Sequence, residues 1–280
     1  MSFSLWDLLV VFLIIMVFLP TYQQRKREAL RWRLMQRIQE REGGVRIIAM
    51  IHRQESLSLL GLSLQRFIDI EDSEQVLRGI RSTDDKTPID LLLHTPGGLV
   101  LASEQIAQAL AAHPARVRVL VPHYAMSGGT LLALAADEIV MDENAVLGPI
   151  DPQLGRYPAA SILEAVRLKG MTNVDDDTLV YADLARKAMI QVKHNAVNLL
   201  KRKHPIEEAK RIGQALTEGR WTHDYPLNVE ELRALGISVK VGLCDEVYQL
   251  MDLYPQPSSR RPSVQYIPPP PKRTRPKANG

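Results

Sequence analysis

The chain has 280 residues, of which 45% are hydrophobic and 24% are charged, and its formal net charge is +3. The positive charge belongs to the two ends: residues 44–254 carry 22 basic and 28 acidic side chains, which excludes a basic nucleic-acid-binding domain. Its single cysteine, Cys244, excludes an internal disulfide framework, and a central part of about 200 residues is long enough to fold as one domain.

The first 22 residues are predicted to form a membrane anchor. Residues 3–19 are apolar apart from Ser4 and Asp7, and the basic residues follow this run instead of preceding it, unlike in a cleaved signal peptide. The positive-inside rule places the basic flank in the cytoplasm, so we expect a single transmembrane helix with the following domain on the cytoplasmic side. An interfacial helix is the alternative, because the apolar run is short and Asp7 is costly within a bilayer.

Residues 23–43 are predicted to form a basic juxtamembrane helix. Leu30, Leu34 and Ile38 recur at four-residue spacing, and this apolar stripe would pack on an anionic membrane surface or against a neighbouring subunit. A plain connecting helix is the alternative.

Residues 44–254 are predicted to form one α/β domain. Strands over residues 45–52, 88–94, 116–121 and 138–141 alternate with helices inside residues 63–81 and over residues 99–112 and 130–136. This alternation favours right-handed βαβ units and a mainly parallel sheet. Further helices follow from residues 178 and 206, and the proline-rich basic segment 255–280 is expected to be a disordered or polyproline-like tail.

Two glycine turns follow neighbouring predicted strands. One contains Ser127, Gly128 and Gly129, and the other contains Gly97 and Gly98. Turns of this kind meet at the edge where open parallel sheets bind ligands, so the N–H groups of Gly98 and Gly128 would converge on one oxygen atom as an oxyanion hole. Ser127, at the N-terminus of a helix, is a candidate nucleophile or only a helix cap.

The ordered motifs around these turns resemble the Clp-protease/crotonase superfamily. They are Thr-Pro-Gly-Gly at 95–98, Ala-Met-Ser-Gly-Gly-Thr at 125–130, Ala-Ala-Asp-Glu-Ile-Val-Met at 135–141 and Ala-Val-Leu-Gly-Pro at 145–149. Within the superfamily the chain is most similar to the membrane-associated signal peptide peptidase A-like branch, which includes the serine dehydrogenase proteinase family, and residues 219–236 and 242–246 are similar to the closing helix and strand of that branch. The resemblance covers residues 45–250. It implies a Clp-protease-like fold, a nucleophilic Ser127, oxyanion donors at Gly98 and Gly128, and assembly into a homo-oligomeric ring.

The general base implied by the resemblance is a lysine. Clp proteases carry a histidine where this chain has residues 147–153, which include none. The signal peptide peptidase branch uses a lysine further along, and Lys169 matches best, ahead of Lys187 and Lys193. A lysine base must be buried, because its pKa of about 10.4 keeps it protonated at neutral pH; the alternative is that Lys169 is a surface residue.

Four other side chains near these motifs have alternative roles. His223 would serve as the base of a triad, but its neighbour Asp224 is poorly placed to orient it, since adjacent side chains point in different directions. His94 and His123 would line the cleft or be structural. Asp151 stands near the place of the missing histidine, where it would position the peptide or have a structural role.

The sequence therefore predicts a membrane-anchored serine endopeptidase that cleaves peptides or membrane-derived proteins. It would act through a Ser127–Lys169 dyad and an acyl-enzyme, without metal, cofactor or nucleic-acid partner. One alternative is a crotonase-type acyl-CoA enzyme, which would stabilise a thioester enolate in the same glycine hole. The other is a catalytically inactive oligomeric membrane scaffold, which gains support if Lys169 is exposed and far from Ser127.

Overall fold

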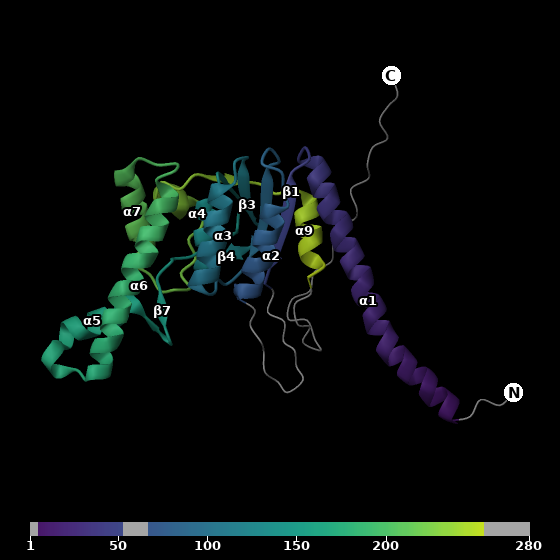
Figure 1. Ribbon diagram of the computed structural model, residues 1–280, viewed down its shortest axis with the longest axis horizontal. Helices are drawn as coiled ribbons and strands as arrows, with labels where there is room; N and C mark the ends of the chain where they lie inside the picture. Colours follow the sequence, from purple (N-terminus) through teal and green to yellow (C-terminus); the bar gives the residue numbers. More distant parts are fainter. Residues whose placement is uncertain (1–4, 53–66, 255–280) are drawn as a thin grey trace, which may run out of the picture.

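A five-stranded parallel sheet forms the centre of the computed structural model, which describes residues 5–52 and 67–254 and, between residues 5 and 20, only some of the side chains. The strand order is β1 (Arg46–Ile51), β2 (Ile89–His94), β3 (Val117–Val121), β5 (Glu138–Met141) and β9 (Val239–Val241), and every neighbouring pair is parallel (Figure 1). The predicted α/β class with a mainly parallel sheet is confirmed.

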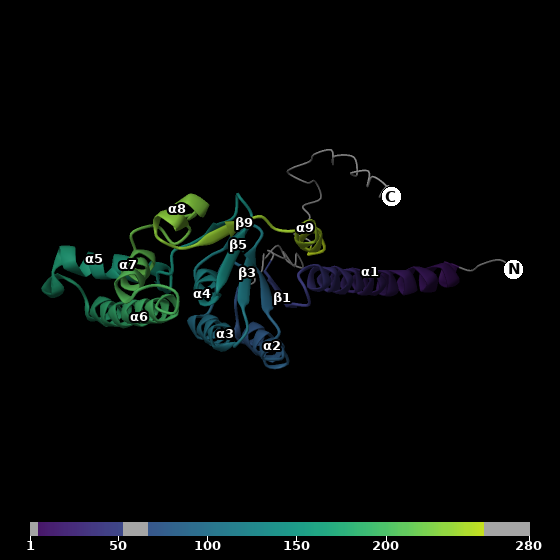
Figure 2. The same cartoon turned by 90° about the horizontal axis from the view of Figure 1, so that it is seen from above.

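Helices cover both faces of this sheet (Figure 2). The connecting helices α2 (Ile70–Arg81), α3 (Val100–Ala112) and α4 (Gly128–Ala135) lie on one face, and α1 (Leu5–Arg41) and α9 (Asp245–Asp252) lie on the other. The alternation along β2 explains this arrangement, since Leu91 and Leu93 belong to the core under α2–α4 whereas Leu92 packs with side chains of α1 and α9.

The remaining elements form an arm and a closing segment. The arm comprises residues 153–190: the hairpin of β7 (Gln153–Leu154) and β8 (Tyr157–Pro158), helix α5 (Ala159–Lys169), the 3₁₀ turn η1 (Met171–Asn173) and the first half of α6 (Asp176–Leu200). It projects from the body of the molecule in both views (Figures 1 and 2). Helices α7 (Ile206–Thr217) and α8 (Val229–Ala234) follow, and β4 (Tyr124–Ala125) pairs in parallel with β6 (Val146–Leu147).

Helix α1 runs without a break from Leu5 to Arg41, so the predicted anchor and juxtamembrane segments form one helix. Its second half docks on the domain: Arg31 donates two hydrogen bonds to the carbonyl oxygen of Leu253 and lies 3.8 Å from the ring centre of Tyr254. Among the residues that the structure describes, no helix has the length and apolarity needed to cross a membrane. Residues 1–4, most anchor side chains and the predicted tail 255–280 lie outside the described residues.

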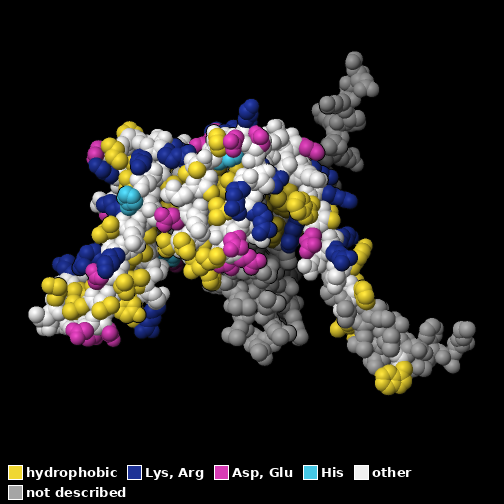
Figure 3. Space-filling view, viewed as in Figure 1, with side chains coloured by type: hydrophobic (Ala, Val, Ile, Leu, Met, Phe, Trp, Pro, Cys, Tyr) yellow, Lys and Arg dark blue, Asp and Glu magenta, His cyan; other side chains and the backbone are white. Residues whose placement is uncertain are grey.

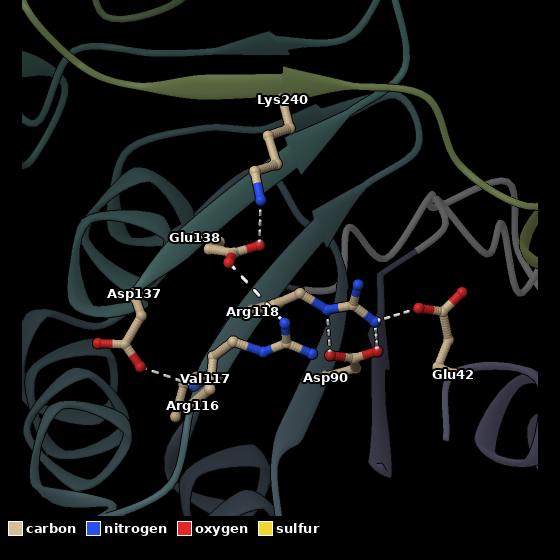
Figure 4. A network of polar contacts seen from close by, with 8 residues as sticks. All are labelled: Glu42, Asp90, Arg116, Val117, Arg118, Asp137, Glu138 and Lys240. Atoms are coloured by element: carbon tan, nitrogen blue, oxygen red, sulfur yellow. Dashed lines mark hydrogen bonds and ion pairs between the residues drawn. The ribbon is translucent and has the colours of Figure 1, made fainter. Parts of the chain in front are cut away.

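A buried ion-pair network joins α1 to the sheet (Figure 4). Arg118 of β3 makes a two-pronged contact with the fully buried Asp90 of β2, in which Nε lies 2.7 Å from Oδ1, and it also binds Glu42 just after α1 at 2.7 Å. Hydrogen bonds from Arg118 to these carboxylates, chiefly to Asp90, raise the pKa of the guanidinium, so the charge is permanent. Nearby, Lys240 of β9 binds Glu138 of β5 at 3.0 Å.

Replacing Arg118 by methionine is expected to lower the free energy of unfolding by about 3–5 kcal/mol, because it leaves the Asp90 carboxylate buried and unpaired. Urea denaturation measures the change. The matched control combines Asp90→Leu with Arg118→Met, which removes both charges and should be more stable than Arg118→Met alone. A single variant as stable as the wild type would show that the contact between Arg118 and Asp90 does not stabilise the fold.

Candidate active site

Ser127 lies on a strained turn between β4 and α4. Its backbone has φ +52° and ψ −115°, and among the described residues it alone has a positive φ without being glycine. Its side chain makes no capping hydrogen bond to α4, so the alternative of an ordinary helix cap is not supported. Strain of this kind costs on the order of 1–3 kcal/mol and is characteristic of serine nucleophiles exposed on strand-to-helix turns.

The second glycine turn lies against the first. Gly97 has φ +103°, and a Cβ atom added to it would lie 2.8 Å from Cβ of Ser127. The neighbouring Gly98 packs on the backbone of Ile68, where an added Cβ would lie 2.2 Å from the carbonyl oxygen. Only glycine therefore fits at both positions, and the chain at residues 97–98 comes into direct contact with the serine turn.

The N–H groups of Gly98 and Gly128 are adjacent and free. Neither donates a hydrogen bond within the described part of the chain, and a Cβ on Gly128 would lie 3.6 Å from the Gly98 nitrogen. The first turn of α4 contributes its own positive dipole end at the same place. Two unpaired donors beside a serine are the arrangement that an oxyanion hole requires.

These groups open into one cavity of about 260 Å³. Its lining combines polar side chains with an apolar wall, and it comprises Pro96, Gly98, Val100, Ser103, Ser127, Gly128, Leu131, Ile150, Asp151, Pro152, Gln153, Val192, Asn195 and His223. Residues from both glycine turns, from α3 and α6, and from the segments before β7 and α8 thus converge on Ser127.

A histidine–aspartate pair completes this cavity. Nδ1 of His223 lies 2.8 Å from Oδ1 of Asp151, whose side chain is 1% exposed, whereas that of His223 is 34% exposed. The other carboxylate oxygen of Asp151 accepts a hydrogen bond from Nε2 of Gln153 at 2.6 Å. Because the carboxylate binds Nδ1–H, the imidazole keeps Nε2 free for a proton from a nucleophile.

Ser127 Oγ and His223 line the same cavity without a hydrogen bond between them in the described part of the chain. Such catalytic hydrogen bonds are often long before substrate binds and shorten in the complex. Ser127, His223 and Asp151 therefore have the composition of a serine–histidine–aspartate triad, with the acid bound to the correct ring nitrogen.

Lys169 does not reach this cavity. It is exposed at the last residue of α5, and both views place α5 at the outer end of the arm, away from α4 (Figures 1 and 2). The burial that a lysine base needs is absent there, so the structure gives no support to Lys169 as a desolvated base beside Ser127. The weaker candidates are also engaged elsewhere: Lys187 pairs with Asp183, and Lys193 binds Gln214 at 3.2 Å.

The other two histidines considered from the sequence do not line the cavity. His94 is buried, with its ring centre 4.2 Å from that of Tyr124, and His123 is exposed. Sequence reasoning missed the pairing of His223 with Asp151, although it singled out both residues. The signal that could have revealed this pair was the carboxylate of Asp151, near the place where Clp proteases carry a histidine. Because Asp151 and His223 are 72 positions apart, the sequence did not show that they meet.

A buried relay holds the turn that carries Gly98. Thr95 Oγ1 accepts the Gly97 N–H at 3.2 Å and lies 2.8 Å from Nδ1 of His52, whose Nε2 lies 3.1 Å from Asp72. A carboxylate only accepts, so His52 carries a proton on Nε2, and in the neutral ring Thr95 donates to Nδ1. Burial raises the pKa of Asp72, but hydrogen bonds from His52 and from the Asp69 N–H outweigh it and hold this pKa below its ordinary value.

Thr130 fixes the serine turn in a similar way. Its buried hydroxyl lies 2.9 Å from the carbonyl oxygens of Ala125 and Gly148, and the Gly148 N–H donates back to it at 3.0 Å. These bonds connect the first turn of α4 to the segment that leads to Asp151. The turn that carries Ser127 and the segment that leads to Asp151 are therefore linked through one side chain.

A larger cavity of about 550 Å³ lies in the arm, between the β7–β8 hairpin, α5 and the start of α6. Its lining includes Ser161 and the carboxylates of Asp175 and Asp177 but, among the described residues, no histidine or lysine that would serve as a base. Chemistry therefore favours the smaller cavity at Ser127 as the active site, despite its lesser volume.

Comparisons with known proteins give one matching family and two similar relatives. The model of the ClpP-like SDH-type serine proteinase family matches residues 1–280. The chain is 53% identical over 271 residues to the uncharacterized protein MJ0137 of Methanocaldococcus jannaschii, covering 97% of this chain and 93% of the relative. It is 54% identical over 260 residues to the uncharacterized protein MJ1495 of the same organism, covering 93% of this chain and 88% of the relative.

Replacing Thr95 by valine should loosen the Gly97–Gly98 turn, because it leaves the Gly97 N–H and the His52 ring without their shared partner. The free energy of unfolding is expected to fall by about 1–3 kcal/mol, and the Gly97 amide should exchange its hydrogen faster. Denaturation and amide exchange measure both effects. Thr95→Ser, which retains the hydroxyl, is the control; wild-type stability and exchange in the valine variant would contradict a structural role of the relay.

Proposed function

Because the chain belongs to the ClpP-like SDH-type serine proteinase family, we propose that it is a serine peptidase with Ser127 as nucleophile and His223, oriented by Asp151, as general base. The observation that carries the proposal is the convergence of three features in one cavity: the strained serine, two free backbone donors and the histidine–aspartate pair. A nucleophile, a base that is itself oriented and a pair of oxyanion donors are the groups that acyl transfer uses, and this cavity offers all three.

The proposed reaction begins when Ser127 Oγ attacks the carbonyl carbon of a peptide bond and His223 Nε2 takes its proton. The carbonyl oxygen becomes an oxyanion that accepts hydrogen bonds from the N–H groups of Gly98 and Gly128. His223 then gives the proton to the leaving amine, which leaves an acyl-enzyme. Water then loses a proton to the same nitrogen and attacks the ester carbonyl. The imidazolium returns this proton to Ser127 Oγ as the acid product leaves, and the carboxylate of Asp151 stabilises the imidazolium in both steps.

The cavity wall supports apolar substrates. Val100, Leu131, Ile150 and Val192 face the same small volume as the catalytic side chains. A pocket of this size and lining fits one apolar side chain next to the scissile bond. We therefore propose peptides or membrane-derived segments with an apolar residue at that position as the substrates.

The two other functions receive less support. A crotonase-type enzyme usually takes a carboxylate as acid or base. Of the described residues that line this cavity, Asp151 alone is a carboxylate, and it already binds His223 and Gln153. The hypothesis of an inactive scaffold would gain support from an exposed Lys169. His223 supplies the base that Lys169 was expected to provide, so the exposure of that lysine does not imply inactivity.

Self-assembly is also part of the proposal. Apolar side chains gather at the outer end of the arm in Figure 3. The exposed apolar residues of the arm include Tyr157, Leu168, Met171, Val180, Tyr181 and Ile190. A patch of this kind on a water-soluble surface is characteristic of a protein interface. This supports the homo-oligomer that the family resemblance implies.

The central prediction compares three single variants in hydrolysis of a fluorogenic peptide with an apolar residue before the scissile bond. Ser127→Ala and His223→Ala should each lower kcat by about 10⁴-fold or more, because they remove the nucleophile and its base. Lys169→Ala should retain kcat within about twofold, as expected for an exposed side chain outside the cavity.

Asp224→Asn is the matched control, since Asp224 is exposed and adjacent to His223 but does not line the cavity. It should behave as the wild type. Loss of activity in Lys169→Ala together with an active His223→Ala variant would instead establish the serine–lysine dyad.

We further propose that residues 1–22 attach the protein to a membrane with the domain on the cytoplasmic side. The support is the apolar run at residues 3–19 followed by the basic residues from Arg25 onward. The full chain should then sediment with membranes and resist extraction by alkaline carbonate. Release by carbonate would indicate an interfacial helix, and recovery in the soluble fraction from the start would refute the attachment.

A further inference from the structure

Ser103 presents an unpaired buried hydroxyl to the active-site cavity. It lies in the first turn of α3, it is 1% exposed, and its Oγ has no hydrogen-bond partner among the described residues. It lines the cavity together with Ser127, Gly98 and Gly128. The proposed peptide hydrolysis by Ser127, His223 and Asp151 gives this hydroxyl no role.

An unpaired buried hydroxyl needs a specific reason, because such a group loses its bonds to water and gains none in return. A serine within a helix usually satisfies its hydroxyl by donating to a carbonyl oxygen one turn earlier. The carbonyl oxygen of Leu99 is available in this position and accepts the Ser103 N–H at 3.0 Å, yet the hydroxyl does not bind it. The side chain is therefore held toward the cavity.

The Ser103 hydroxyl lies next to the proposed oxyanion donors. A Cβ atom on Gly128 would lie 2.2 Å from Ser103 Oγ and 3.6 Å from the Gly98 nitrogen. Three potential donors thus surround one small volume beside Ser127. Any side chain at residue 128 would displace the hydroxyl, which gives Gly128 a second function besides the turn.

We propose that Ser103 is a third donor of the oxyanion hole, a catalytic residue that binds the substrate carbonyl oxygen together with the Gly98 and Gly128 N–H groups. An oxygen atom that becomes negatively charged accepts three hydrogen bonds, and a hydroxyl rotates freely to donate one. The bond strengthens as charge develops during attack by Ser127, so it stabilises the transition state more than the bound substrate. This inference rests on the proposed peptidase function.

Replacing Ser103 by alanine provides the test, with steady-state hydrolysis of the fluorogenic peptide as the first readout. We expect kcat to fall by about 10²–10³-fold with little change in KM, as for loss of a side-chain oxyanion donor in other enzymes. The affinity for a peptide aldehyde, which forms a tetrahedral adduct with Ser127, should fall by a similar factor. The melting temperature should equal or exceed that of the wild type, because the variant removes an unsatisfied buried group.

Ser73→Ala is the matched control. Ser73 is also a buried helical serine, but its hydroxyl donates to the Ile70 carbonyl oxygen at 2.8 Å and lies outside the cavity lining. This variant should lose some stability and keep kcat, which is the opposite of the pattern expected for Ser103→Ala. If Ser103→Ala does not fold, Ser103→Cys retains the size and donates only weakly, so it should fold and turn over slowly.

Wild-type kcat and aldehyde affinity in a folded Ser103→Ala or Ser103→Cys variant would overturn the inference. A lower melting temperature with unchanged kcat would assign the hydroxyl a structural role and would also overturn it. The Ser127→Ala variant distinguishes a failure of the peptidase proposal from a failure of the third-donor proposal. If that variant remains active, the peptidase proposal itself fails, whereas an inactive Ser127→Ala beside a fully active Ser103→Ala refutes only the third donor.

Discussion

The strained backbone at Ser127 is the constraint on which the site depends. A positive φ at a residue with a side chain is unfavourable, so the fold must hold it from several directions. The short β4–β6 pairing and the buried hydroxyl of Thr130 do this, and Thr130 also joins the turn to the segment leading to Asp151. The result is a serine that projects into the cavity at the positive end of α4 instead of capping that helix.

The donors around Ser127 are held in place before any substrate arrives. The relay from Asp72 through His52 to Thr95 fixes the Gly97–Gly98 turn, and contact with Ile68 fixes it from the other side. Within the described residues, this framework holds a set of unpaired groups, namely two backbone N–H groups and the buried hydroxyl of Ser103. An unpaired buried hydroxyl lowers stability, but donors that need no rearrangement stabilise a developing negative charge most effectively.

Much of this fold follows from local sequence patterns. The βαβ alternation, the two glycine turns and the position of Ser127 at the start of a helix depend on residues close together in the chain, and each was predictable. The proposed base was not predictable, because matching Lys169 by its distance along the chain says nothing about burial. Lys169 ends a helix of the projecting arm, whereas His223 and Asp151 meet across 72 positions, a contact set only by how the segments before β7 and α8 pack. The unpaired hydroxyl of Ser103 could not be predicted from the sequence either. That it lacks a hydrogen-bond partner among the described residues follows from how the cavity folds.

The most direct measurement is covalent labelling of the full chain with a fluorophosphonate, followed by peptide mapping to locate the modified residue. The account predicts a single label on Ser127, formed about 10⁴-fold more slowly when His223 is replaced by alanine and at the wild-type rate when Lys169 is replaced. A label on another serine, or a rate that depends on Lys169 and not on His223, would contradict the proposed triad.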